Sequence, residues 1–210
     1  MRTRAKICGL SRPEDIRAVA SAGADAIGLV FYEPSPRNVS IEQACELLQH
    51  ISPFITVTGL FVNADAEQVR RVLSQVPLDL LQFHGDEPEA FCRRFDRPYI
   101  KAIRVNAQTD ISALAEHYHS ARGLLLDTYV SGKPGGTGEV FDWGLIPSSL
   151  PLPVILAGGL NAANVAAAIR QVKPYAVDVS GGVEESKGIK SPAMIKEFMQ
   201  EVQAVGKAEG

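Results

Sequence analysis

The sequence has few cysteines and no long apolar run. Its 210 residues include three cysteines, which are widely spaced and form no CxxC pair. A disulfide framework or a cysteine-based zinc site is therefore not expected, and reduced thiols in a cytoplasmic protein are the simplest interpretation. No segment approaches the roughly 18 apolar residues of a membrane helix, and the apolar stretch after the basic start is too short for a signal peptide.

An excess of charge of one sign is also absent. Lysine and arginine number 21, aspartate and glutamate 24, and the net charge is −3. This balance provides no basic field for nucleic acid or an anionic membrane, so we expect neither as a partner. Apolar residues make up 46% and charged residues 21%, which excludes a disordered or fibrous chain. Without a linker or low-complexity tract, residues 1–210 are expected to form one domain.

The sequence instead alternates between two kinds of segment. Short apolar runs alternate with longer segments whose apolar residues recur at helical spacing. Continuous apolar runs are typical of parallel strands covered on both faces. The pattern predicts an α/β fold, a single-domain (β/α)₈ TIM barrel, whereas a doubly wound sheet is disfavoured because no GxGxxG follows the first run. The eight predicted strands are Ala5–Gly9, Ala26–Phe31, Ile55–Val62, Leu78–His84, Tyr99–Val105, Gly123–Asp127, Pro153–Ala157 and Ala176–Ser180.

Most helical segments carry a start signal. Three have a serine or aspartate followed three residues later by glutamate or glutamine, the spacing of a capping box. Another segment begins near an asparagine, and the last begins with a serine before a proline. The helix after Trp143 is expected to be short. The predicted starts are Ser11 with Glu14, Ser40 with Gln43, Asp86 with Glu89, Asn161, and Ser191 with Pro192.

Two strand ends carry candidate proton-transfer groups, because catalytic residues of barrels lie at the carboxyl ends of strands. Lys6 and Cys8 share one face of the first strand, and a nearby ammonium can lower the pKa of a thiol. A buried packing cysteine beside a structural lysine explains the pair equally well. Asp127 ends a leucine run and is a candidate general acid or base, although it could cap the next loop. Cys45 and Cys92 lie on apolar helical stripes and are expected to pack.

Two glycine pairs follow the seventh and eighth strands. Gly158 and Gly159 form the first pair, and Gly181 and Gly182, after Ser180, form the second. Glycine lets the backbone approach a ligand closely, and barrels often hold phosphate between these two loops. Either pair alone could be a tight turn, but the two together predict a phosphate site.

Three further features are weaker. Arg37 could pair with a substrate carboxylate, although a solvated surface arginine explains it better on its own. His84 could donate to a ligand or satisfy a loop carbonyl. The glycine-rich residues 132–138 could form a lid or a plain surface loop. No group of histidine and acidic residues has metal-ligand spacing, so no metal is expected.

Seven short motifs, in order from residue 4 to about residue 200, carry a family resemblance. They are Lys6–Leu10, Gln82–Gly85, Leu126–Asp127, Gly135–Gly138, Phe141–Trp143, Leu156–Leu160 and Asp178–Glu184. Together they closely resemble the phosphoribosylanthranilate isomerases of tryptophan biosynthesis. The departures are small, for example Ser180-Gly181-Gly182 where the family often has Ser-Ser-Gly, and none removes a candidate catalytic group.

The resemblance implies an Amadori rearrangement of N-(5-phosphoribosyl)anthranilate to the corresponding amino ketose. It implies that Cys8 removes the proton from ribose C2 and that Asp127 protonates the ring oxygen. It also implies that Arg37 holds the anthranilate carboxylate and that Ser180 and the two glycine pairs hold the phosphate. Lys6, His84 and Asp178 are expected to support the substrate. No cofactor is implied, and the partner is a small phosphosugar bound by a cytoplasmic monomer or homodimer.

Two other functions remain open from the sequence. The aminoaldose isomerase of histidine biosynthesis resembles this reaction, but it uses carboxylates as both acid and base, which the cysteine in the first strand argues against. A non-enzymatic phosphate-binding protein is the other alternative, and it would not need both proton-transfer groups.

Overall fold

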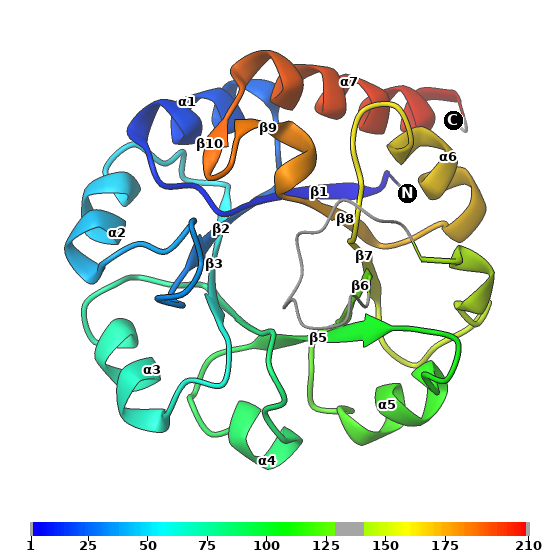
Figure 1. Ribbon diagram of the computed structural model, residues 1–210, viewed down its shortest axis with the longest axis horizontal. Helices are drawn as coiled ribbons and strands as arrows, with labels where there is room; N and C mark the ends of the chain where they lie inside the picture. Colours follow the sequence, from blue (N-terminus) through cyan, green and yellow to red (C-terminus); the bar gives the residue numbers. More distant parts are fainter. Residues whose placement is uncertain (1, 129–140, 209–210) are drawn as a thin grey trace.

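The computed structural model describes residues 2–128 and 141–208, which form one closed parallel barrel. Strands β1 to β8 pair in sequence order, and β8 closes on β1 with Lys6 opposite Asp178. The helices surround this ring (Figure 1). The barrel strands are β1 (Arg4–Cys8), β2 (Ala26–Val30), β3 (Thr56–Phe61), β4 (Leu80–Phe83), β5 (Tyr99–Val105), β6 (Leu124–Thr128), β7 (Val154–Leu156) and β8 (Ala176–Val179). The barrel prediction is confirmed, with strands generally somewhat shorter than predicted.

Seven α-helices and two 3₁₀ segments occur in the described ranges. A (β/α)₈ barrel has a helix after each strand, but the described residues after β6 carry only the 3₁₀ segment η1 (Trp143–Leu145). The label α6 therefore belongs to the helix after β7. None of these helices combines the length and apolar character needed to cross a bilayer. The others are α1 (Pro13–Ala22), α2 (Ile41–Leu48), α3 (Ala66–Leu73), α4 (Glu89–Cys92), α5 (Ile111–His117), α6 (Val165–Val172), η2 (Gly181–Val183) and α7 (Pro192–Ala208). A hairpin of β9 (Glu184–Ser186) and β10 (Ile189–Lys190) precedes α7.

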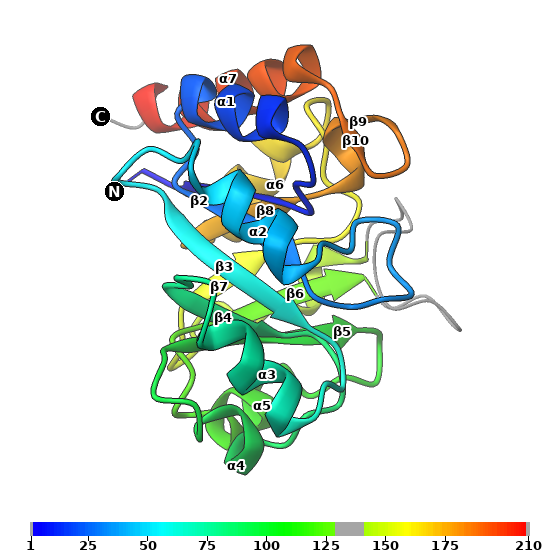
Figure 2. The ribbon, with the colours of Figure 1, turned by 90° about the vertical axis from the view of Figure 1, so that its left-hand side faces the viewer.

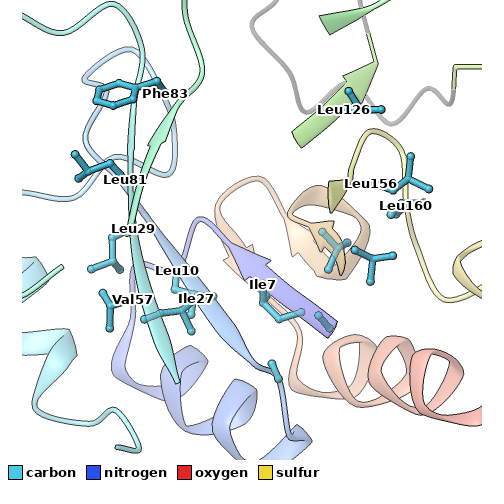
Figure 3. Close-up of a cluster of buried hydrophobic side chains, with 14 of the residues drawn as sticks. Ile7, Leu10, Ile27, Leu29, Val57, Leu81, Phe83, Leu126, Leu156 and Leu160 are labelled. Atoms are coloured by element: carbon cyan, nitrogen blue, oxygen red, sulfur yellow. The ribbon is translucent and has the colours of Figure 1, made fainter. Parts of the chain in front are cut away.

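Alternation along each strand separates two layers of side chains. Outward residues such as Ile7, Leu29 and Leu126 pack against the helices in the main core (Figure 3). Inward residues form a small separate cluster inside the barrel, which includes Ile100 and Leu125. Because side chains alternate between the two faces of a strand, polar residues at the carboxyl ends point inward where their neighbours point outward. Cys92 is fully buried and Cys45 packs at the edge of the core, as predicted.

Two of the predicted capping boxes are wrong because tertiary contacts engage their first residues. Helix α1 is preceded by Arg12, while the Ser11 hydroxyl donates to the Gly188 carbonyl in the β9–β10 hairpin. Helix α4 is preceded by Pro88, while the carboxylate of Asp86 accepts from Arg104.

The other predicted helix starts agree better with the observed helix ends. Ser40 caps α2 by accepting from the Gln43 amide, and α7 begins at Pro192 after Ser191. Asn161 caps the turn before α6 rather than the helix itself, which begins after Asn164. The box prediction therefore holds where no distant group competes for the capping side chain.

A buried ion pair fixes the loop after β4. Lys101, on the outer face of β5, is 2% exposed and donates to the Gly85 carbonyl (2.6 Å) and to Glu87 Oε2 (3.0 Å). Replacing Lys101 by methionine leaves Glu87 buried without its cation, so we expect a loss of about 3–5 kcal/mol of unfolding free energy. Urea denaturation measures it. The control is Arg104→Met at an exposed pair, where less than about 1 kcal/mol should be lost. Equal losses in the two variants would contradict the prediction.

Candidate active site

One cavity of about 830 Å³ lies at the carboxyl ends of the strands. Every site residue predicted from the sequence lines it except Lys6, which lies beneath it and reaches it through Asp178. Cys8 and Asp127 thus face the same space from β1 and β6. The lining residues that the sequence predicted are Cys8, Arg37, His84, Asp127, Gly158, Gly159, Asp178, Ser180, Gly181 and Gly182. The predicted lid at residues 132–138 lies outside the described residues.

Cys8 points into the barrel beside a glycine that the sequence reasoning missed. Gly28 pairs with Cys8 in the β1–β2 register, and a Cβ at position 28 would lie 2.6 Å from the Cys8 sulfur. Such a contact is too close for any side chain, so only glycine leaves room for the thiol. A glycine inside a predicted strand was the available signal, because it often marks a close approach.

Adding a methyl group at position 28 should therefore displace the thiol. By displacing the candidate base Cys8, Gly28→Ala should lower kcat by roughly 10²-fold, because a shift near 1 Å at a catalytic group has such an effect. The matched control is Gly59→Ala, whose Cβ would meet Leu78 Cδ1 at 2.4 Å on the outer face, away from the cavity. That variant should lose stability by overpacking and keep its kcat. Steady-state kinetics and thermal unfolding separate the two, and equal kcat values would refute the role of Gly28.

Burial and three neighbouring charges set the pKa of the Cys8 thiol. Lys6 donates to Asp178 Oδ1 at 2.9 Å, and both side chains are less than a tenth exposed. Burial opposes the charge of Lys6, but Asp178 and Cys8 outweigh it and raise the pKa of the lysine. Burial also raises the pKa of Cys8, and the opposing effects of Lys6 and Lys190 do not overcome it. Lys6 thus lowers the thiol pKa as expected, but burial is the larger effect and Asp178 adds to it, so the pKa of Cys8 is raised overall.

The raised pKa of Cys8 predicts how the reactivity of this thiol depends on pH. Because burial favours the neutral thiol, the thiolate fraction at pH 7 is below that of an ordinary cysteine with a pKa of 9.0. The alkylation rate of Cys8 by iodoacetamide should rise with pH, with its midpoint above 9.0. Peptide mass spectrometry distinguishes Cys8 from the half-buried control Cys45. A midpoint below 9.0 would show that the cations dominate over burial.

Asp127 is held by two hydrogen bonds. Its Oδ1 accepts from the Thr128 amide (2.8 Å), and its Oδ2 lies 3.1 Å from His84 Nε2. Gln82 Nε2 contacts His84 Nδ1 at 2.9 Å. With the glutamine amide donating, Nε2 of the neutral imidazole carries the proton and donates to Asp127. His84 thus contacts a carboxylate rather than a loop carbonyl and also lines the cavity, and Asp127 both accepts from the backbone and faces the cavity.

The two glycine loops meet at the cavity wall. Gly158 and Gly159 have positive φ angles of 82° and 64°, and a Cβ at Gly158 would lie 2.9 Å from Asp127 Oδ1. A Cβ at Gly182 would lie 1.9 Å from the Leu160 carbonyl oxygen. The loops after β7 and β8 are therefore in direct contact, as a shared phosphate site requires. The 3₁₀ segment η2 follows at Gly181.

Arg37 is not a solvated surface arginine. Its side chain is 13% exposed, and its Nε and Nη2 donate to the two carboxylate oxygens of Glu184 at 2.7 and 2.8 Å. Glu184 also accepts from Lys190, a residue that sequence reasoning missed. Burial alone would raise the pKa of Glu184, but Arg37 and Lys190 lower it below its usual value. Its position in the Asp178–Glu184 motif was the only sequence signal for Glu184.

These groups define a (β/α)₈-barrel protein equipped for acid–base chemistry on a small anion. A thiol and a carboxyl face one cavity, with an arginine and paired glycine loops around them. Within the described residues, no group of three or more histidine, cysteine or acidic side chains could hold a metal ion.

Residues 5–201 match the family described as N-(5'-phosphoribosyl)anthranilate (PRA) isomerase, and the chain belongs to that family. An N-(5'-phosphoribosyl)anthranilate isomerase of Pseudomonas putida (strain W619) is 59% identical over 199 residues, covering 95% of this chain and 97% of the relative. One of Pseudomonas fluorescens (strain Pf-5) is 60% identical, covering 95% of each.

Solved structures agree. The phosphoribosylanthranilate isomerase of Thermotoga maritima superposes with a TM-score of 0.89 at 39% identity, covering 96% of this chain and 99% of the other. The chain is therefore an isomerase of tryptophan biosynthesis. It catalyses the Amadori rearrangement of N-(5-phosphoribosyl)anthranilate to 1-(2-carboxyphenylamino)-1-deoxyribulose 5-phosphate.

Proposed function

We propose that Cys8 is the general base and Asp127 the general acid of this isomerisation. The observation that carries the proposal is their position on β1 and β6, facing one cavity that the two glycine loops also line. Each group projects from a rigid strand end, where barrel enzymes place their catalytic residues.

Asp127 and Cys8 each transfer one proton in this rearrangement. Asp127, as the carboxylic acid, donates its proton to the furanose ring oxygen, and the bond from C1 to that oxygen breaks to leave an open-chain iminium. The Cys8 thiolate then removes the proton from C2, which gives an enolamine. The enolamine tautomerises to the amino ketose when the C2 hydroxyl loses its proton and C1 gains one. Each proton-transfer group typically contributes about 10²- to 10⁴-fold in rate.

The other residues hold the substrate. The phosphate is assigned to Ser180 and the backbone of the glycine loops, which come together after β7 and β8. Arg37 holds the anthranilate carboxylate. Asp178 lies at the cavity floor between Lys6 and the substrate, and His84 orients Asp127.

Relatives support the ligand and assembly assignments. One solved phosphoribosylanthranilate isomerase is a complex with reduced 1-(o-carboxyphenylamino)-1-deoxyribulose 5-phosphate, at a TM-score of 0.85 and 37% identity. The Thermotoga maritima enzyme is described as dimeric, with monomers generated from it. We assign this chain a phosphosugar substrate and a monomeric or homodimeric state. Its free thiols fit a reducing compartment such as the cytoplasm.

A side-by-side assay tests the proposed chemistry. Purified protein is given phosphoribosylanthranilate, followed by its fluorescence, and separately the aminoaldose of histidine biosynthesis. A cysteine at the β1 end predicts turnover of the first substrate. It predicts little or no turnover of the second, because the isomerase of histidine biosynthesis uses carboxylates as both acid and base. Preference for the second substrate would overturn the assignment of Cys8 as base.

A further inference from the structure

The hairpin after β8 carries a buried charge network that the isomerisation chemistry does not use. Glu184 begins β9 and Lys190 ends β10, and the antiparallel register places them opposite each other. Lys190 Nζ lies 2.7 Å from Glu184 Oε1, with the lysine side chain 0% and the glutamate side chain 5% exposed. Figure 2 shows this hairpin at the end of the barrel toward which the β5 and β6 arrows point.

Glu184 occupies one particular edge of Arg37. It takes the Nε and Nη2 donors, which form the side edge of the planar guanidinium. The same plane offers a second pair of parallel donors, Nη1 and the other hydrogen of Nη2, at its end. The aliphatic part of Arg37 is fixed by Gly9, where a Cβ would lie 2.5 Å from Arg37 Cδ. The guanidinium is thus held both by its ion pair and by backbone contact below it.

Lys190 links the Arg37–Glu184 pair to β1, the strand that carries Cys8. Its ammonium also donates to the Ser180 carbonyl (3.1 Å) and lies 3.2 Å from the Ser180 hydroxyl. That hydroxyl donates to the Cys8 carbonyl at 3.0 Å. One buried cation therefore connects the Arg37–Glu184 pair, the phosphate loop and the end of β1. With two cations and one carboxylate, the trio retains one positive charge, which favours an incoming anion.

We propose that Glu184 and Lys190 are positioning residues that present the end edge of Arg37 to the aryl carboxylate of the substrate. The hairpin then determines the preference for an amine that carries a carboxylate over one that does not. This inference rests on the proposed role of Arg37. Breaking the Glu184 pair should free the guanidinium to rotate and weaken binding of the carboxylate without affecting the sugar phosphate.

Two ligands test the proposal by calorimetry. The first is the reduced product, and the second is its analogue made with aniline, which lacks the ring carboxylate. In Glu184→Gln, we expect the Kd of the first ligand to rise about tenfold, with that of the second changed by less than about threefold. Lys190→Met should act in the same direction, and Lys190→Arg should restore the preference. With substrate, KM should rise while kcat changes by less than about threefold.

Neighbouring variants serve as controls. Glu185→Gln on the same hairpin and Lys196→Met on α7 change exposed residues of the same types and should leave both Kd values unchanged. If Glu184→Gln weakens both ligands equally, or neither, the positioning role is overturned. Arg37→Met tests the underlying assignment separately. Loss of carboxylate preference there, with the preference retained in Glu184→Gln, would refute this inference alone. Retention in Arg37→Met would refute the role of Arg37 as well.

Discussion

Cys8→Ser is expected to lower kcat by about 10²- to 10⁴-fold. A hydroxyl is a much weaker acid than a thiol, so the variant has almost no anionic base at neutral pH. Serine is slightly smaller than cysteine and makes no new clash with Gly28, so the barrel should fold unchanged. Stopped-flow fluorescence of phosphoribosylanthranilate in single-turnover mode measures the chemical step directly.

The comparison variant for this test is Cys45→Ser. Cys45 is a half-buried thiol on α2, remote from the cavity, and its replacement should leave kcat unchanged. Binding of the reduced product should survive in Cys8→Ser, because the arginine and the glycine loops remain. Turnover within a few-fold of the wild-type rate would remove Cys8 from the mechanism.

Asp127→Asn is expected to lower kcat by a similar factor of about 10²- to 10⁴-fold. An amide keeps the shape of the side chain and its contact with the Thr128 amide, but it cannot supply an acidic proton to the ring oxygen. Leaving-group expulsion from C1 then lacks assistance, and the substrate should accumulate bound and unopened. The expected signature is a much lower kcat with a nearly unchanged KM.

Asp65→Asn is the matched control for the same chemical change. Asp65 caps α3 by accepting from the Gln68 amide, and asparagine caps helices equally well. Its kcat and stability should match the wild type. An Asp127→Asn enzyme with normal kcat would show that another group protonates the ring oxygen. His84, 3.1 Å from Asp127, would then be the first alternative to test.

The sequence alone predicted the barrel and both candidate proton-transfer residues. Strands buried on both faces must be continuously apolar, so all eight could be found without any distant contact. A residue at a strand end also has a known place, because parallel strands in a barrel end on one face. Cys8, Asp127 and the two glycine pairs were therefore predicted together, and they line one cavity.

Only the tertiary structure decided how the charges pair. Closing the barrel puts Asp178 beside Lys6, 172 residues away, and the resulting ion pair leaves burial as the dominant influence on the Cys8 thiol. The hairpin brings Glu184 to Arg37, 147 residues away. Arg37, which from the sequence resembled a solvated surface residue, is therefore fixed in a mostly buried ion pair. Charge interactions and steric fit depend on distances in space, and those distances are fixed only when chain segments far apart in sequence pack together.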